Sequence, residues 1–591
     1  MKKHIAAGLI FVLCAVLIPS VLLLENSRQS EAWDNSRVKI CLERGEGFTT
    51  NAHLQEIDRE GDAIFQIWLQ EDYEIIDCSY PDYALDQGDG YTLLTLKNVR
   101  YADRVTLRCE IPTSVINYDP NGGCFSENGS AEPLRIAYGP SAHPRINTLS
   151  GQEKLLREGY VMVGWNTAAD GSGDHIGLGS RVTVEKNAEM TLYAQWMQET
   201  PQVLFTWVEA DDGLRLTACL GVEAASLVIP GSIDGRPVTA IAAGFAQGLS
   251  IDSLVIPDSV LRIEEGAFRD CAIEHIYFFD TLRQVSDASF AGSRPRYWHI
   301  GAVVPPRYQG ASDITAFADK MDLLLLHQDE QKLLLFAGCS MNYGMDSSIL
   351  AEAFPEYTVL NLGAVGGTNA QFQFACMLPY LRSGDVFIHA PEQASAYQLM
   401  SSTACENRMF IAVEGNFDLL AQVDMTTLGA GAFDCFRAFN EKRSFMEVGD
   451  YADQYIPLNA YGDNIQQRLA SNQGQFDEDY GLLTELITEN GLDLLAAYYD
   501  RIRAAGAEVY LSYAPINALC CEVPGQVAAF AEAWEQGMQA RGYETISDLK
   551  DYVMEPKYFY DADYHLTTAG AALRAQQLCQ DLQPILTGDG E

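Results

Sequence analysis

Residues 332–340 read Lys-Leu-Leu-Leu-Phe-Ala-Gly-Cys-Ser, and this stretch decides how the C-terminal half of the chain folds. A short continuous apolar run is typical of a strand buried on both faces of a parallel sheet, and a glycine after it indicates a turn. Similar runs recur downstream and alternate with amphipathic helical patterns. This alternation predicts an α/β domain whose parallel sheet is covered on both faces, with sites beyond the carboxyl ends of the strands. The predicted strands are 333–336, 358–362, 385–389, 509–513 and 544–546, and the predicted helices are 369–381, 492–505 and 528–541.

Three polar segments follow these strands or end the domain. Ser340 places a hydroxyl at the first strand end, where a nucleophile belongs. Residues 363–369, Gly-Ala-Val-Gly-Gly-Thr-Asn, can aim backbone N–H groups at an oxyanion, and they lack the lysine of a phosphate loop. In residues 558–567, a carboxylate close to His565 can orient the imidazole. Each segment alone also fits an ordinary polar turn, but their order on one α/β pattern favours a site.

That order resembles the SGNH (GDSL-like) hydrolase superfamily over residues 331–586. The resemblance implies a three-layer flavodoxin-like fold and ester chemistry, by hydrolysis or acyl transfer, with no metal or organic cofactor. It implies Ser340 as nucleophile, His565 as base, and Asp561 or Asp563 as the acidic partner. It also implies oxyanion donors from the backbone of Ser340 and Gly366.

Two positions depart from the family pattern. Cys339 stands where an acidic residue usually precedes the serine, and its thiol is an alternative nucleophile at the same turn. The third block, residues 384–393, lacks the expected asparagine, so we expect the Gln393 amide to donate the missing hydrogen bond, with His389 and Glu392 as rival polar groups. Asp561 is favoured over Asp563 as the partner of His565, and the spacing differs from the usual DxxH because residue 562 is Ala.

The N-terminal half carries β patterns and repeats. Residues 35–112 alternate apolar and polar side chains with the period of two that predicts a small β module. Residues 114–198 contain Ile116-Asn-Tyr-Asp-Pro-Asn-Gly-Gly123 and Gly159-Tyr-Val-Met-Val-Gly-Trp-Asn166, which resemble the Listeria–Bacteroides (internalin B-type) repeat, a β-grasp-like surface module. Residues 202–305 repeat Leu227-Val-Ile-Pro230 as Leu254-Val-Ile-Pro257 and resemble BspA-like leucine-rich repeats. Both modules are typical of spacers or of protein-binding surfaces.

The N-terminal sequence predicts an exported protein, and the composition argues against nucleic-acid binding. Lys2 and Lys3 precede an apolar run at residues 5–24, so residues 1–32 are predicted to be a signal peptide or an uncleaved single-pass membrane anchor. The 39 basic and 81 acidic residues give a net charge of −42, which argues against nucleic-acid binding. The scattered cysteines and histidines show no metal-binding spacing.

The sequence therefore predicts a multidomain cell-surface protein. Its last domain, residues 315–591, carries an insertion at about 401–485 that is either a lid over the site or an inert surface segment. The expected function is an SGNH-type esterase or O-acyltransferase acting on an acylated glycan or cell-envelope polymer. The alternative is a non-catalytic adhesin that binds surface proteins through its repeats, with a degenerate SGNH domain.

Overall fold

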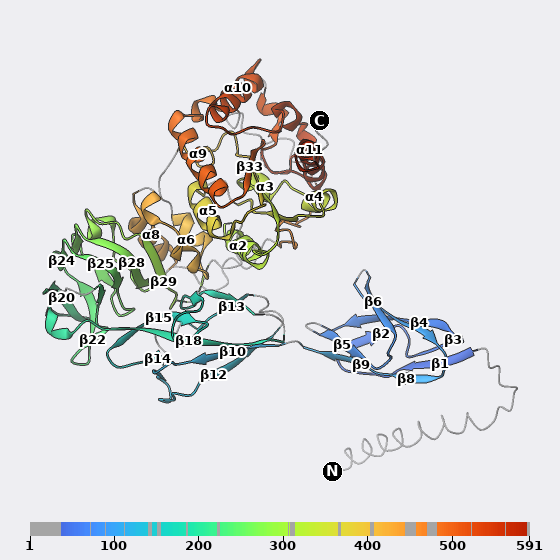
Figure 1. Cartoon of the computed structure of the whole chain (residues 1–591), viewed down its shortest axis with the longest axis horizontal. Helices are drawn as coiled ribbons and strands as arrows, with labels where there is room; N and C mark the ends of the chain where they lie inside the picture. Colours follow the sequence, from blue (N-terminus) through green and yellow to red (C-terminus); the bar gives the residue numbers. More distant parts are fainter. Residues whose placement is uncertain are drawn as a thin grey trace, which may run out of the picture. The chain divides into compact units, whose positions relative to one another are not determined.

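The C-terminal half is built on a parallel sheet with the strand order β31-β30-β32-β33. Alternate side chains of β30 go to opposite faces: Leu334 and Phe336 pack in one core cluster, and Leu333 and Leu335 in another. Figure 1 shows α5 and α9 on one side of this sheet and α4 and α11 on the other. The predicted α/β domain with a parallel sheet covered on both faces is confirmed. Its elements are β30 (Lys332–Phe336), β31 (Thr358–Asn361), β32 (Val386–His389), β33 (Glu508–Leu511), α2 (Ala316–Leu326), α3 (Cys339–Asn342), α4 (Ser347–Ala353), α5 (Ala370–Met377), α9 (Glu489–Ala504), α10 (Gln526–Gln539) and α11 (Thr568–Leu586).

The structure is a computed structural model. It describes residues 37–587 except 71–72, 89, 112, 140–144, 150–154, 185–186, 222–224, 305, 308–313, 365–367, 402–406, 429, 444–456, 470–481, 522 and 562. The predicted signal peptide or anchor at residues 1–32 and the predicted oxyanion residue Gly366 lie outside the described residues.

The fifth predicted strand, residues 544–546, is reduced to a short parallel bridge. Leu511 donates its N–H to the Glu544 carbonyl, and Ile546 donates its N–H to the Leu511 carbonyl. An edge segment of three residues bonds to a neighbour on one side only, so the pairing stops after these two hydrogen bonds. The other four predicted strands are present within two residues of their predicted limits.

Contacts divide the chain into two compact units, of which the first holds residues up to Ser114 together with Tyr138–Ala142. Its sheets have the orders β3-β1-β8, β2-β4-β7-β6 and β5-β9. In β4, Ala63, Phe65 and Ile67 are buried while Ile64 and Trp68 are exposed, which is the predicted period of two. The strands are β1 (Arg37–Leu42), β2 (Phe48–Thr50), β3 (Leu54–Asp58), β4 (Gly61–Leu69), β5 (Glu74–Cys78), β6 (Tyr83–Gln87), β7 (Thr92–Val99), β8 (Asp103–Val105) and β9 (Leu107–Glu110).

The second unit begins with a five-stranded sheet of order β12-β10-β18-β15-β16. Tyr118 and Trp165 are fully buried, and their ring centroids are 4.9 Å apart. The Asn121-Gly122 turn has positive φ at both residues, which glycine and asparagine tolerate best. The elements are β10 (Ser114–Asp119), β11 (Cys124–Phe125), β12 (Leu134–Tyr138), β13 (Arg145–Asn147), β14 (Leu155–Leu156), β15 (Tyr160–Asn166), β16 (His175–Ile176), β17 (Arg181–Thr183) and β18 (Glu189–Gln198).

The internal repeat forms a stack of parallel strands, β21-β25-β28-β29. Leu227, Leu254, Ile276 and Trp298 pair in register across it. The recurring phenylalanines form a ladder beside the strands, with ring centroids 5.7 Å apart for Phe245–Phe268 and 5.2 Å apart for Phe268–Phe290. Each repeat thus buries its apolar side against the next. The elements are β19 (Phe205–Ala210), β20 (Gly213–Cys219), β21 (Ser226–Val228), β22 (Ser232–Ile233), β23 (Arg236–Ile241), β24 (Ala246–Gln247), β25 (Ser250–Val255), β26 (Arg262–Ile263), β27 (Phe268–Arg269), β28 (Ala272–Phe279), η4 (Asp287–Phe290) and β29 (Tyr297–Gly301).

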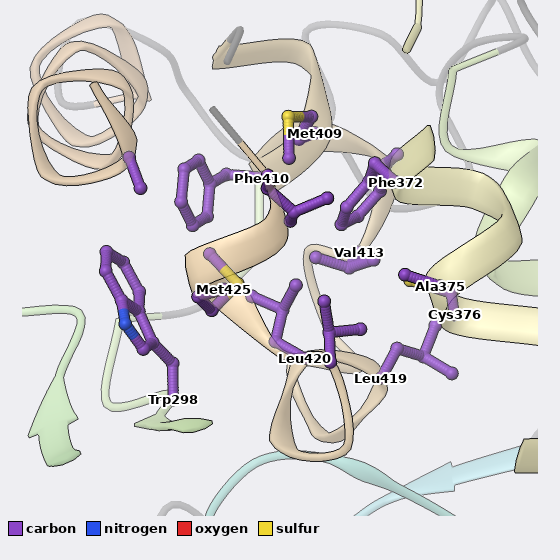
Figure 2. Close-up of a cluster of buried hydrophobic side chains, with 14 of the residues drawn as sticks. Trp298, Phe372, Ala375, Cys376, Met409, Phe410, Val413, Leu419, Leu420 and Met425 are labelled. Carbon is purple, nitrogen blue, oxygen red and sulfur yellow. The ribbon is translucent and has the colours of Figure 1, made fainter. Parts of the chain in front are cut away.

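The described helices of the insertion join the repeat stack to the α/β domain. Phe433 stacks on Trp298 and on Phe290, with ring centroids 4.1 and 4.4 Å apart. In Figure 2, Trp298 of β29, Phe372 of α5 and side chains of the insertion gather in one buried cluster. These helices are α6 (Asn407–Ala412), α7 (Asp418–Ala421), η6 (Met425–Thr427) and α8 (Ala432–Arg443).

Buried ion pairs lie at this junction and at the contact between the preceding β module and α2. Arg443 of α8 pairs with Asp280 of the repeat stack and with Glu414, each at 3.2 Å. Arg181 of β17 pairs with Asp319 and Asp322 of α2, at 2.8 and 2.6 Å. Apolar and ionic contacts thus hold the described helices of residues 407–443 between two modules. A lid or an inert surface segment at 401–485 stays a prediction.

Candidate active site

Ser340 lies in the single turn of α3, directly after β30. The residue is fully buried, and its Oγ has no hydrogen-bond partner among the described residues. The turn packs tightly on the segment after β31, since a Cβ on Gly363 would lie 2.5 Å from the Met341 Cβ. Asn361 fixes the same turn by donating from Nδ2 to the Met341 carbonyl at 3.0 Å.

His565 is oriented by Asp561. The His565 Nδ1 and the Asp561 Oδ1 are 2.8 Å apart, so Nε2 is the nitrogen left to exchange a proton with another group. This hydrogen bond is the main cause that lowers the pKa of Asp561. Asp563 is buried and instead accepts a hydrogen bond from the Cys520 thiol at 3.5 Å. Of the two predicted acidic partners, the structure brings Asp561 to the ring.

The serine turn and the histidine loop meet at the carboxyl edge of the sheet. The ring of Tyr343, three residues after Ser340, stacks on His565 with centroids 4.4 Å apart and an interplanar angle of 27°. A Cβ on Gly344 would lie 3.3 Å from the Leu566 side chain. Within the described residues, no hydrogen bond joins the Ser340 Oγ to His565. The structure therefore brings the two segments together, and the catalytic roles of the two side chains stay predictions.

The third predicted block is engaged in other contacts. Gln393 is buried and its Nε2 donates to the Ala514 carbonyl at 2.9 Å, so this donor is already engaged. Glu392 accepts the Ser340 N–H at 2.7 Å through Oε1. His389 shares a hydrogen bond with the Tyr499 hydroxyl, and burial lowers its pKa to about 3, which keeps the ring neutral. The backbone donor that the resemblance assigns to Ser340 is thus bonded to a carboxyl group.

Two buried basic side chains support the site, and sequence reasoning did not find them. Arg574 of α11 donates from Nη1 to the carbonyls of Ser340, at 2.8 Å, and Gly344, at 3.3 Å, while burial lowers its pKa to about 10. Lys320 of α2 is fully buried and donates from Nζ to the Gly363 carbonyl at 2.5 Å. Burial lowers the pKa of Lys320 to about 7. Both residues lie in helices of the structure, and a basic side chain is normally solvated, so nothing in the sequence marks these two as buried.

A cysteine nucleophile stays an alternative prediction. Cys339 is partly exposed and neighbours the fully buried Ser340 at the start of α3. Across the described ranges of the chain, no group of three or more histidine, cysteine, aspartate or glutamate side chains is placed to hold a metal ion.

The chain is similar to a known protein over part of its length. No family model matches the chain. A protein of Evansella cellulosilytica described as "Putative membrane protein" is 26% identical over 185 residues, which cover 29% of this chain and 27% of that protein. The chain thus spans about a quarter of the length of this relative. In the part of the chain that the structure describes, no helix has the length and apolar character needed to cross a bilayer. The single-pass anchor at residues 1–32 stays a prediction.

Proposed function

We propose that residues 315–591 form an SGNH-type serine esterase or O-acyltransferase that acts on acylated glycans of the cell envelope or the extracellular space. The observation that carries the proposal is the stacking of His565, held by Asp561, on the turn that contains Ser340. A base with an oriented ring beside a hydroxyl nucleophile is the arrangement that acyl transfer needs.

The strand order supports a flavodoxin-like topology. β30 lies between β31 and β32, so the chain order reads 2-1-3-4 across the sheet. In such sheets ligands bind beyond the carboxyl ends of the strands, where the strand order reverses. Ser340 follows β30 and Glu392 follows β32, and the hydrogen bond between them crosses this point.

In the proposed mechanism the ring of His565 takes the proton of the Ser340 hydroxyl through Nε2 as Oγ attacks the ester carbonyl. Asp561 holds the Nδ1–H and stabilises the imidazolium that forms. The proton then passes to the alkoxide that leaves, and an acyl-serine remains. Water releases the acyl group as a carboxylic acid in hydrolysis, whereas a sugar hydroxyl accepts it in transfer. A buried hydroxyl without a partner costs on the order of 1–3 kcal/mol, and a hydrogen bond to His565 would recover that energy.

The substrate class follows from context. A predicted export segment and two modules of a surface-protein type precede the domain, which favours an envelope or extracellular polymer over a cytosolic ester. The net charge of −42 favours neutral or cationic polymers over anionic ones.

Labelling with a fluorophosphonate probe tests the proposal. The wild-type chain should form an adduct at Ser340 and hydrolyse p-nitrophenyl acetate, and Ser340→Ala should lose both. Cys339→Ser is the matched control, because it alters the neighbouring side chain and should keep both activities. No labelling of a folded wild-type chain would contradict the enzyme and favour the non-catalytic adhesin. Loss of activity in Cys339→Ser with persistence in Ser340→Ala would assign the nucleophile to the thiol.

A further inference from the structure

Two buried charged side chains form hydrogen bonds with the backbone of Ser340, one with its N–H and one with its carbonyl. Glu392 takes the N–H at 2.7 Å, and Arg574 donates to the carbonyl oxygen at 2.8 Å. Glu392 is 3% exposed and Arg574 is 2% exposed. The first lies after β32 and the second in α11, so two distant parts of the chain converge on this one residue.

The two charges also act on each other. Burial lowers the pKa of Arg574, and Tyr552 and then the carboxylate of Glu392 oppose that effect by favouring the protonated guanidinium. A buried charge costs several kcal/mol unless it is paired and hydrogen-bonded, and apolar side chains of similar volume are often as stable or more so. A stability role alone therefore explains this pair poorly, and the contacts with Ser340 suggest a positional one.

The loop of Glu392 also contacts the histidine loop. Ala394 donates its N–H to the hydroxyl oxygen of Tyr564 at 3.1 Å, and Tyr564 immediately precedes His565. A single short loop is thus bonded to the backbone of the nucleophile and to the neighbour of the base.

We infer that Glu392 and Arg574 are positioning residues, which form a clamp that fixes the backbone of Ser340 for attack. The inference rests on the proposed function and deepens it. It also changes one implied role: with its N–H bonded to Glu392, Ser340 does not supply the oxyanion donor. The other oxyanion residue that the resemblance implies, Gly366, lies outside the described residues.

A second set of buried, oppositely charged side chains serves as a control, because its expected role is structural alone. Lys332 and Asp385 are 3.0 Å apart and their side chains are fully buried. They lie at the amino ends of β30 and β32, the same two strands whose carboxyl ends lead to Ser340 and Glu392. Breaking this pair should lower stability without a specific effect on Ser340.

The test is a double-mutant cycle on the rate of fluorophosphonate labelling of the full chain, with the melting temperature measured in parallel. Glu392→Gln and Arg574→Met should each slow labelling about 10- to 100-fold, because a small misplacement of the nucleophile is costly. The double variant should be no slower than the slower single variant, since coupled residues are non-additive. With p-nitrophenyl acetate, kcat should fall while KM stays constant, and Arg574→Lys should restore part of the rate.

Several results would overturn the clamp. One is labelling of Glu392→Gln at the wild-type rate. Another is additive losses in the double variant, and a third is an equal loss of labelling in Asp385→Asn. The proposed function is tested separately, because it fails if the wild-type chain shows no Ser340-dependent labelling, and the positioning role then fails with it. Wild-type labelling with unaffected variants refutes the clamp alone.

Discussion

Replacing Lys320 with methionine should remove a large dependence of stability on pH. Lys320 is fully buried beneath the segment that leads to the predicted oxyanion loop, and its Nζ bonds the Gly363 carbonyl. Burial is the main cause that lowers its pKa from 10.5 to about 7, and the carboxylate of Asp463 opposes part of that effect. The folded chain therefore holds the proton of this lysine far less tightly than the unfolded chain does.

The sign and the magnitude follow from proton linkage. Between pH 7 and 10.5 the unfolded chain carries a proton on Lys320 that the folded chain has lost, so the free energy of unfolding rises with pH. The slope is about 1.4 kcal/mol per pH unit, which makes the full effect roughly 5 kcal/mol. Below pH 7 both states are protonated, and the folded state bears the whole penalty. From pH 6.5 to 9.5, the wild-type chain should gain roughly 3 kcal/mol relative to Lys320→Met.

Urea unfolding followed by far-ultraviolet circular dichroism measures this difference across the pH range. Contributions of other titrating groups cancel when the two chains are compared at each pH. Lys320→Arg is the matched control, because a guanidinium stays protonated and should not regain stability at high pH. A wild-type minus Lys320→Met difference that is flat or falls with pH would refute the reasoning. It would mean that water or a carboxylate reaches the ammonium group in solution.

Two further changes test the site and the junction between modules. Asp561→Asn should lower ester turnover by two to four orders of magnitude at pH 7, because the ring loses its orienting carboxylate, whereas Asp563→Asn, which touches Cys520 instead, should change turnover far less. Equal losses in the two variants would contradict the assignment. Phe433→Ala should destabilise the second unit by about 3–5 kcal/mol and speed proteolysis of residues 407–443, since Phe433 is 2% exposed between Trp298 and Phe290. Unchanged urea unfolding and proteolysis would show that the stacking contributes little.

The sequence predicted the fold best where a single physical rule acts on neighbouring residues. Continuous apolar runs predicted the four main strands, because a strand buried on both faces has no polar positions to confuse the pattern. The strand-end rule also predicted that the segments of Ser340 and His565 meet, since carboxyl ends of parallel strands share one edge. Alternation in an extended segment could not separate Asp561 from Asp563, because residues 561, 563 and 565 would then share one face, and only the hydrogen bond between Asp561 and His565 distinguishes them.

The supporting charges could not be predicted, because their partners are distant in the chain. Arg574 contacts a carbonyl 234 positions away, and the contact between Glu392 and Ser340 spans 52 positions. No local sequence pattern shows that a lysine or an arginine is buried. These residue types are usually exposed, so an exposed side chain is the ordinary expectation. The packing of α8 was easier to predict in part, because Phe433, Phe436 and Phe439 recur every three residues on one helix face. The repeat stack against which they pack lies more than a hundred residues earlier in the sequence, so the partner could not be predicted.

The junction between the repeats and the α/β domain connects the fold to the proposed chemistry. α5 begins directly after the glycine-rich segment 363–369, and Asn369 caps it by accepting the Gln371 N–H. The buried face of α5, with Phe372, Ala375 and Cys376, lies in the cluster that also holds Trp298 of β29 (Figure 2). A close-packed cluster transmits a change in one part to its neighbours, because it has little free volume to absorb it. The repeat stack and α5 thus belong to one buried cluster, so the repeats contribute to the packing of the helix that follows the predicted oxyanion segment in the sequence.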